Sequence, residues 1–374
     1  MTRNTLICTV GTSLFTNLKN AEEPIRKAFE ARNWNQLSLL LLEKSSLARV
    51  CGAEINSITS ICEKRFLSGR IRLIFLVSDT EDGRKTGNIL KLYYTHSSNP
   101  LRFETTEVRV LEGLRDDSVK DFKQLGLKNL VREISTEVRK FSPETIAINA
   151  TGGYKAQISF AGMIGHALGI PVYYLFEKFS EVIELPPQPI ALDLAFWMNH
   201  YLLFERLENS QTIEKSQIDA DFQDEYFISL IDEEVINDVN YVSSSAMGVL
   251  FNERSRLPFA KQETAILSLI PKDDTAPERK QIHLRDDHGK DVLEKFAKKV
   301  CRSPYVKGVI NSLPFNSRLT EPIRRTYQNG IVEFVMTWED KGFGICIQTT
   351  GRNLAETNGI ALHLKKQFAE KKPL

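Results

Sequence analysis

Two loops combine glycine with small polar side chains, as sites that bind phosphate groups do. The first spans residues 9–13 (TVGTS) and completes an apolar run, and the second spans residues 149–155 (NATGGYK). Glycine lets a ligand approach the backbone closely, and hydroxyls and free N–H groups at a helix start can hold phosphate or ribose oxygens. In the second loop Tyr154 can stack on a base and Lys155 can reach a phosphate. The spacing excludes a Walker A loop, which needs GxxxxGK[ST].

A third loop, residues 78–84 (SDTEDGR), adds the candidate contacts Asp79 and Thr80 and the cation Arg84. Each loop alone could be an ordinary tight turn between a strand and a helix. All three follow predicted strands, and the carboxyl ends of parallel strands meet at one edge of a sheet. The sequence therefore favours a nucleotide-like ligand at that edge.

The elements that must position these loops alternate between short apolar runs and longer helical patterns. Strands are predicted at residues 6–10, 72–77, 106–111, 145–149 and 171–175. Helices are predicted at residues 22–33, 47–65, 119–141 and 155–168. This βαβ rhythm predicts an α/β fold with a doubly wound, Rossmann-like, mostly parallel sheet. An edge strand at residues 182–185 and the prolines after it predict that this domain spans residues 1–187.

The remaining sequence changes in charge and pattern. A partly helical connector is predicted over residues 188–275, where residues 205–240 hold 11 acidic and 2 basic side chains. An α+β domain with an antiparallel sheet is predicted over residues 276–374. Its expected elements are a strand at 281–285, helices at 290–301 and 305–312, strands at 321–327, 331–338 and 344–349, and a helix at 354–368. Residues 281–374 hold 16 basic and 10 acidic side chains, which makes this end the first place to expect a nucleic-acid contact.

Composition limits the class of protein. The 374 residues, 42% hydrophobic and 26% charged, are typical of a globular protein with two or three domains. We find no apolar run of about 18 residues and no apolar signal core at the start, so we expect a cytoplasmic protein without a membrane partner. The five cysteines are scattered and form no CxxC pair, so we expect reduced thiols and no structural zinc or other metal.

The first domain resembles the CARF domain, the sensor of CRISPR-associated proteins that binds cyclic oligoadenylate. The resemblance rests on the strand followed by Gly-Thr-Ser, on the turn Asn-Ala-Thr-Gly-Gly-Tyr-Lys-Ala and on the strand order over residues 1–185. It implies a homodimer, because a symmetric ring lies across the two-fold axis. It also implies no cofactor but an activator, cyclic tetra-adenylate. The contacts that it implies are Gly11, Thr12, Ser13, Thr151, Gly152, Gly153 and Lys155, to which loop composition adds Asp79, Thr80 and Tyr154.

A sensor requires an effector, and the known effector classes differ in their residues. HEPN ribonucleases need an Arg and a His closely spaced on one helix, and this chain lacks that spacing. A metal-dependent PD-(D/E)xK nuclease needs an acid followed by ExK; residues 339–341 (EDK) supply those letters, with Glu333 or Glu321 upstream. Because Lys341-Gly342 is typical of a hairpin turn, this class is our alternative.

Residues 280–374 resemble RelE-type toxins, small ribonucleases that cut mRNA in the ribosomal A site. The resemblance rests on two predicted helices before the strands, on residues 322–334 (PIRRTYQNGIVEF) and on Thr-Thr-Gly-Arg at 349–352. It implies a metal-independent, ribosome-dependent endoribonuclease, that is, an mRNA interferase acting with ribosome and mRNA to inhibit translation in type III CRISPR antiviral defence. The candidate catalytic residues are Arg352, Arg324, Arg325, Tyr327, His363 and His288.

The chemistry fits these residue types. Attack of a ribose 2′-OH on its own phosphate needs charge stabilisation, a base and an acid, but no metal. Arg352 matches the family's strand-end arginine and is assigned to the phosphate. Arg324 and Arg325 face opposite sides of a strand, so only one is expected to point into the site. Tyr327, His363 and His288 are the acid, base or stacking candidates. A regulator that binds nucleic acid through its basic end without cutting it remains the non-enzymatic alternative.

Overall fold

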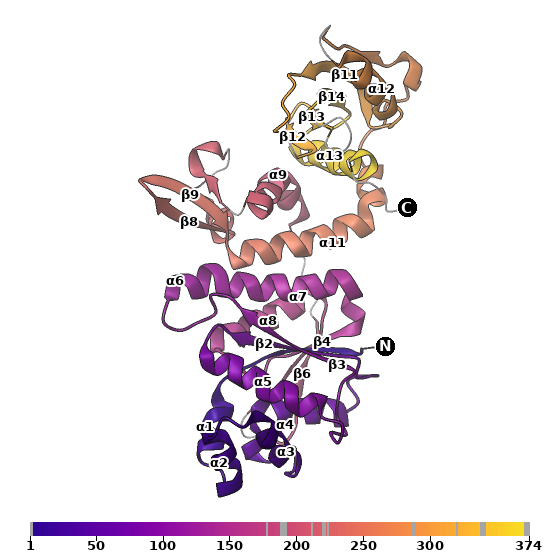
Figure 1. Cartoon of the computed structure of the whole chain (residues 1–374). Helices are drawn as coiled ribbons and strands as arrows, with labels where there is room; N and C mark the ends of the chain where they lie inside the picture. The colour runs from indigo at the N-terminus through magenta and orange to yellow at the C-terminus, as the bar shows by residue number, and fades with distance from the viewer. Residues whose placement is uncertain are drawn as a thin grey trace. The chain divides into compact units, whose positions relative to one another are not determined.

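The computed structural model describes residues 3–176, 179–187, 193–210, 212–218, 222, 224–285, 289–318, 321–336 and 342–369, without the side chains of residues 257, 258 and 260–262. The chain divides into two compact units that alternate along the sequence (Figure 1). The first unit comprises residues 1–191, 221–232 and 244–251, and the second comprises residues 192–220, 233–243 and 252–374. Both units contain helices and strands, so the chain is a mixed α/β protein. The assignment of a sensor, a connector and an effector to residues 1–187, 188–275 and 276–374 stays a prediction.

A six-stranded sheet forms the centre of the first unit. Its strands, in the order β3-β2-β1-β4-β5-β6, are β3 (Thr105–Leu111), β2 (Arg72–Ser78), β1 (Thr5–Thr9), β4 (Ile146–Asn149), β5 (Val172–Tyr174) and β6 (Ile183–Leu185). The first five are parallel, and β6 is an antiparallel edge strand. The chain builds the sheet outward from β1 in one direction and from β4 in the other, so the topology switches between these two strands. This arrangement confirms the predicted mostly parallel sheet and its edge strand.

Helices cover both faces of this sheet. They are α1 (Ser13–Lys19), α2 (Glu23–Glu30), α3 (Trp34–Leu42), α4 (Gly52–Glu63), α5 (Glu81–Thr95), α6 (Val119–Asp121), α7 (Leu127–Phe141) and α8 (Lys155–Leu168), with a π-helical segment η2 (Phe122–Gly126) joining α6 to α7 and short 3₁₀ turns η1 (Arg49–Cys51) and η3 (Pro143–Thr145). In Figure 1, α7 and α8 lie on one side of the sheet and α4 and α5 on the other. The sheet is therefore doubly wound, as the βαβ rhythm predicts.

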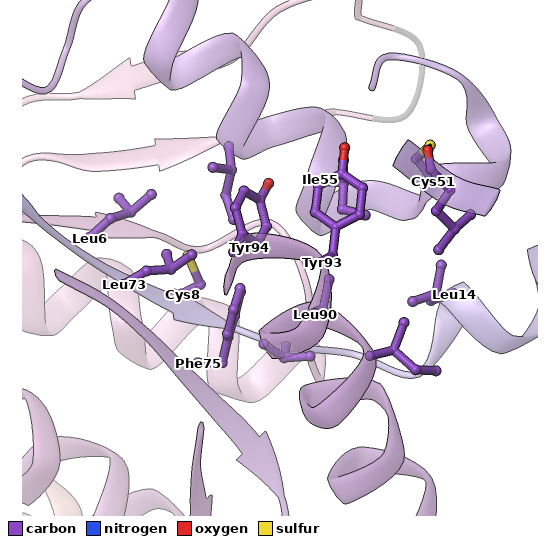
Figure 2. Packing of buried hydrophobic residues seen from close by; sticks show 14 of the residues in the cluster. Leu6, Cys8, Leu14, Cys51, Ile55, Leu73, Phe75, Leu90, Tyr93 and Tyr94 are labelled. Carbon is purple, nitrogen blue, oxygen red and sulfur yellow. The ribbon is translucent and has the colours of Figure 1, made fainter. Parts of the chain in front are cut away.

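Buried side chains fix the strands that carry the loops. Leu6 and Cys8 alternate along β1, and Leu73 and Phe75 do the same along β2. Figure 2 shows these side chains directed toward the helices, where they pack with Ile55 of α4, among others. Each fully buried aliphatic or aromatic side chain contributes about 1.5–3 kcal/mol. The strand ends are thus held by a core rather than by the loops themselves.

The second unit is built on a five-stranded sheet of order β10-β11-β14-β13-β12. Its strands are β10 (Gln281–Ile282), β11 (Val306–Leu313), β12 (Ile323–Thr326), β13 (Ile331–Val335) and β14 (Gly344–Thr349). β10 runs parallel to β11, and the other neighbours are antiparallel. The helices α12 (Lys290–Val300) and α13 (Leu354–Phe368) complete its core. The antiparallel meander and both helices agree with the sequence predictions.

One predicted element of this unit is wrong. Residues 305–312 were expected to form a helix, whereas Val306–Leu313 form strand β11. Register shifts between Val306 and Gly308 and between Val309 and Asn311 interrupt the pairing with β14. Bulges of this kind break the strict alternation of a strand, which is why the burial pattern imitates a helix. The second helix on which the RelE resemblance relies is therefore absent at this position.

The segment between the two sheets contributes to both units. Its elements are α9 (Leu194–Ser210), β7 (Ile213–Glu214), η4 (Lys215–Gln217), α10 (Glu225–Ser229), β8 (Ile231–Ile236), β9 (Val239–Ser244), α11 (Ala246–Ser268) and η5 (Pro277–Arg279), with a three-stranded sheet of order β7-β9-β8. In the part of the chain that the structure describes, no helix has the length and apolar character needed to cross a membrane.

Candidate functional site

The loops after β1 and β4 touch each other at the topological switch point. A Cβ atom built at Gly11 would lie 2.9 Å from the Gly153 nitrogen, so the backbones are in contact. The Thr9 hydroxyl donates a hydrogen bond of 2.5 Å to the Gly152 carbonyl. Gly153 has φ of +115°, a conformation that favours glycine. The structure thus brings together two of the three predicted loops, at the position where doubly wound sheets bind ligands.

A buried carboxylate, Glu54 of α4, lies beneath both loops. Its Oε1 atom accepts a hydrogen bond of 2.8 Å from the Gly11 N–H, and a Cβ atom at Gly152 would overlap the same carboxylate. The side chain is 1% exposed, and its Oε2 atom has no hydrogen-bond partner among the described residues. Burial raises the pKa of Glu54, and the hydrogen bond from Gly11 opposes that rise. Glu54 positions the two loops and is absent from the sequence predictions.

The raised pKa of Glu54 predicts an effect on stability. The folded chain holds this proton to higher pH than the unfolded chain, whose Glu pKa is about 4.3. The contribution of Glu54 to stability therefore falls as pH rises from about 4.3 to the folded pKa, and it stays low above that pKa. Glu54→Gln is expected to be more stable than the native chain at pH 7, with the difference shrinking toward pH 4.3. Thermal unfolding at several pH values measures this, and a constant difference would contradict it.

Thr151 is used by the fold rather than offered to a ligand. Its hydroxyl donates to Asn149 Oδ1 at 2.7 Å and accepts from the Leu175 N–H at 3.0 Å. Asn149 is itself buried, and its amide donates to Ser57 Oγ at 2.8 Å. These bonds shape the turn that presents Gly152 and Gly153, so Thr151 is better described as supporting the site.

Tyr154 and Lys155 begin the helix at this edge. Lys155 is exposed and is the first residue of α8, whose N-terminal N–H groups favour an anion. The Tyr154 ring meets Phe122 edge to face, with 5.4 Å between centroids. Thr12 and Ser13 are also exposed. Hydroxyls, a cation and free backbone donors therefore line one small area, which suits a phosphodiester with a nearby base.

The third loop mainly holds its own elements together. The Thr80 hydroxyl accepts from the Gly83 N–H at 3.0 Å and caps α5. Asp79 pairs with Arg84 at 2.5 Å and accepts from the Gly113 N–H at 3.1 Å. Both side chains are half-buried. The polar atoms of Asp79 and Thr80 therefore serve the fold.

Arg352 borders a pocket of the second unit. The pocket has a volume of about 540 Å³ and is lined by Asn199, Gln328, Asn329, Arg352, Asn353 and Leu354. The exposed guanidinium of Arg352 donates to Glu356, with Nη2 at 2.6 Å from Oε1. This pairing raises the pKa of Arg352 and lowers that of Glu356. A permanent cation beside amide groups can bind a phosphate.

Tyr327 and Arg324 converge on one acid, Glu333 of β13. The Tyr327 hydroxyl donates to Glu333 Oε1 at 2.8 Å, and Arg324 Nε lies 3.4 Å from Oε2. Glu333 is 9% exposed, whereas both arginines of β12 are exposed. A register shift between Ile323 and Arg325 disturbs the alternation that would have turned the two arginines to opposite faces. Tyr327 directly precedes Gln328, which lines the Arg352 pocket.

The partners of His363 are other residues than Tyr327, Arg324 and Glu333. His363 Nδ1 lies 2.6 Å from Glu263 Oε1, which also accepts a neighbouring ammonium, Lys366, on its other oxygen. Although burial alone would raise it, these two hydrogen bonds lower the pKa of Glu263. His363 also meets Tyr305 edge to face. His288 lies outside the described residues, as does the segment 339–341 of the metal-nuclease alternative. Among the residues that are described, no three His, Cys, Asp or Glu side chains form a metal cluster.

Comparison with known proteins finds a matching family model and similar solved structures. Can2 from Sulfobacillus thermosulfidooxidans in complex with cyclic tetra-adenylate (cA4) shares 12% sequence identity, with 82% of this chain and 88% of that chain covered, at a TM-score of 0.25. So low a TM-score supports no inference about this chain. The family model described as CRISPR-associated protein (Cas_APE2256) matches residues 49–188, a stretch that holds Glu54 and the loops at 78–84 and 149–155. Over those residues the chain is similar to a family of CRISPR-associated proteins.

Proposed function

We propose that the first unit binds a cyclic oligoadenylate and that the chain acts in CRISPR antiviral defence as a ligand-activated endoribonuclease. The observation that carries the proposal is the contact of two glycine-bearing loops at the switch point of a parallel sheet, within a unit whose residues 49–188 match a CRISPR-associated family. Exposed hydroxyls, the Lys155 cation and the start of α8 suit phosphodiester groups, and Tyr154 suits an adenine.

The ligand that we assign is cyclic tetra-adenylate, and the active species is a homodimer in the cytoplasm. A ring of identical nucleotides has rotational symmetry, so two copies of the chain related by a two-fold axis can contact it through the same loops. In this proposal the first unit binds the ring and uses no cofactor.

The second unit supplies the endoribonuclease in this proposal. The 2′-oxygen of a ribose bonds to the adjacent phosphorus, the 5′-oxygen leaves and takes up a proton, and the products carry a 2′,3′-cyclic phosphate and a 5′-hydroxyl. In this proposal Arg352 stabilises the phosphate charge, and the hydrogen-bonded pair of Tyr327 and Glu333 takes the 2′-hydroxyl proton and gives a proton to the leaving 5′-oxygen. The step needs no metal. The ribosome presents the mRNA, and translation stops when the message is cut.

The deciding experiment follows mRNA in a translation extract and the same mRNA without ribosomes, each with and without cyclic tetra-adenylate and EDTA. We expect cuts only with ribosomes and ligand, unaffected by EDTA, and with 5′-hydroxyl ends mapped by primer extension and end labelling. Cutting of naked RNA that EDTA abolishes would favour the metal-dependent nuclease. Tight ligand binding without any cutting would favour the regulator that only binds nucleic acid.

A further inference from the structure

A chain of contacts leads away from the candidate ligand loop within the first unit. Tyr154, at the end of that loop, touches Phe122, the first residue of the π-helical segment η2. At the other end of η2, a Cβ atom at Gly126 would lie 2.6 Å from Leu114 Cα, in the loop after β3. That loop is bonded to Asp79 through Gly113. Both ends of η2 therefore rest on loops at the ligand edge of the sheet.

The π-helical segment also holds a buried acid. Asp232, whose side chain is 2% exposed, forms ion pairs at 3.1 Å with Lys123 of η2 and with Lys128 of α7. The Lys128 side chain is 7% exposed, whereas that of Lys123 is 68% exposed. The two lysines lie on either side of the last residues of η2. A change in the winding of η2 would therefore alter their spacing around Asp232.

The first unit includes two segments from the middle of the chain, and Asp232 is the last residue of the first of them. Residues 221–232 belong to the first unit, and Glu233 begins the next stretch of the second. The Ser245 hydroxyl donates to the Ser229 carbonyl at 2.8 Å, and the Ser245 N–H donates to the Leu230 carbonyl at 2.9 Å, so residues 224–232 are tied to the start of α11. The ion pairs of Asp232 therefore lie at the point where the chain leaves the first unit.

We infer that η2 is the element that transmits ligand binding at Tyr154 to the chain segment at Asp232. A π-helical turn carries one residue more than an α-helical turn, and such turns occur often at functional sites. Rewinding it as α-helix rotates the preceding residues by about 100° relative to α7. Stacking of a base on Tyr154 changes the Phe122 contact, η2 rewinds, and Lys123 leaves Asp232 while Lys128 of α7 keeps it. The ligand shifts the equilibrium because it binds the two windings unequally.

The test uses hydrogen–deuterium exchange of the full chain with cyclic tetra-adenylate, and it rests on the proposed function. In the native chain, we expect the ligand to change exchange at least twofold in residues 122–130 and 224–251 as well as at the 149–155 loop. In Lys123→Ala, whose charge is mostly exposed, the change in 224–251 should fall below half, while the loop still responds and the dissociation constant changes less than about threefold. Phe122→Leu should behave in the same way. Lys91→Ala, an exposed lysine of α5, is the matched control.

The outcomes separate this inference from the function on which it rests. Ligand binding with an unchanged response of 224–251 in Lys123→Ala and Phe122→Leu would overturn the transmission through η2 and leave the sensor intact. The same holds if 224–251 of the native chain does not respond to bound ligand. Absence of any binding would overturn the sensor and the transmission together.

Discussion

Replacing Gly152 by alanine should lower the affinity for cyclic tetra-adenylate at least tenfold and reduce thermal stability. The added Cβ atom would overlap the Glu54 carboxylate and lie 3.0 Å from the Gly11 nitrogen, so either α4 or one loop must shift. Overpacking in a filled site costs typically about 1–3 kcal/mol. The displaced carboxylate would also lose its hydrogen bond from Gly11, which holds the first loop. Calorimetric titration and thermal unfolding measure the two effects.

Gly162 provides the matched control on the same helix–loop unit. It lies within α8, and a Cβ atom there would meet nothing within 4 Å. Because alanine is favoured over glycine inside a helix, Gly162→Ala should gain about 0.5–1 kcal/mol and keep ligand affinity. Equal affinities of Gly152→Ala and the native chain would mean that the contact of the two loops does not form the binding site.

Arg352→Ala should reduce ribosome-dependent cleavage by about 10²–10³-fold, the usual effect of removing one group that stabilises transition-state charge. The residue is exposed and precedes α13, whose first turn holds its partner Glu356, so the fold should be unaffected. Ligand affinity should also be unchanged, because Arg352 belongs to the second unit. Single-turnover cleavage of a ribosome-bound message, with unfolding as a second readout, measures the loss.

Lys298→Ala is the control for this loss. Lys298 pairs with Glu294 one turn away on α12, as Arg352 pairs with Glu356, and it lies in the same unit. Cleavage by Lys298→Ala should stay within about twofold of the native rate. An equal loss in both variants would assign the effect to surface charge along an RNA-binding face and remove Arg352 from the catalytic pocket.

The sheet of the first unit is predictable because its strands are short, apolar and bounded by loops. Helix α5 is not predicted, because its sequence contains Gly83 and Gly87 and glycine disfavours a helix. A Cβ atom at Gly87 would lie 2.6 Å from Val108, so the glycine is needed for the helix to pack closely on the sheet. Strand β11 is misread for a related reason: its bulges are imposed by pairing with β14, which no local pattern reveals.

The loops of the candidate site can be predicted from the sequence, but their hydrogen bonds cannot. Glycines after strands indicate where a ligand could approach, and the structure brings loops 9–13 and 149–155 together. A hydroxyl can bind a ligand or another part of the protein, and the outcome depends on hydrogen-bond partners that lie far away in the sequence. The Thr151 hydroxyl, for example, accepts a hydrogen bond from the Leu175 N–H. The importance of Glu54 could have been predicted, because it is an acid on the buried face of α4 beside Ile55 and Ile58. A charge on such a face marks a specific interaction.

The alternation of the two units along the sequence limits how this protein could have arisen and how it can be divided. The chain passes between the units at residues 232/233, 243/244 and 251/252, among other places. A fragment ending near residue 187 would lose Asp232 and with it the ion pair to Lys128. Recombination at a single junction would have the same defect. We therefore expect the two units to be inherited together, and an exchange of the second unit in the laboratory to succeed only when residues 221–232 and 244–251 remain with the first.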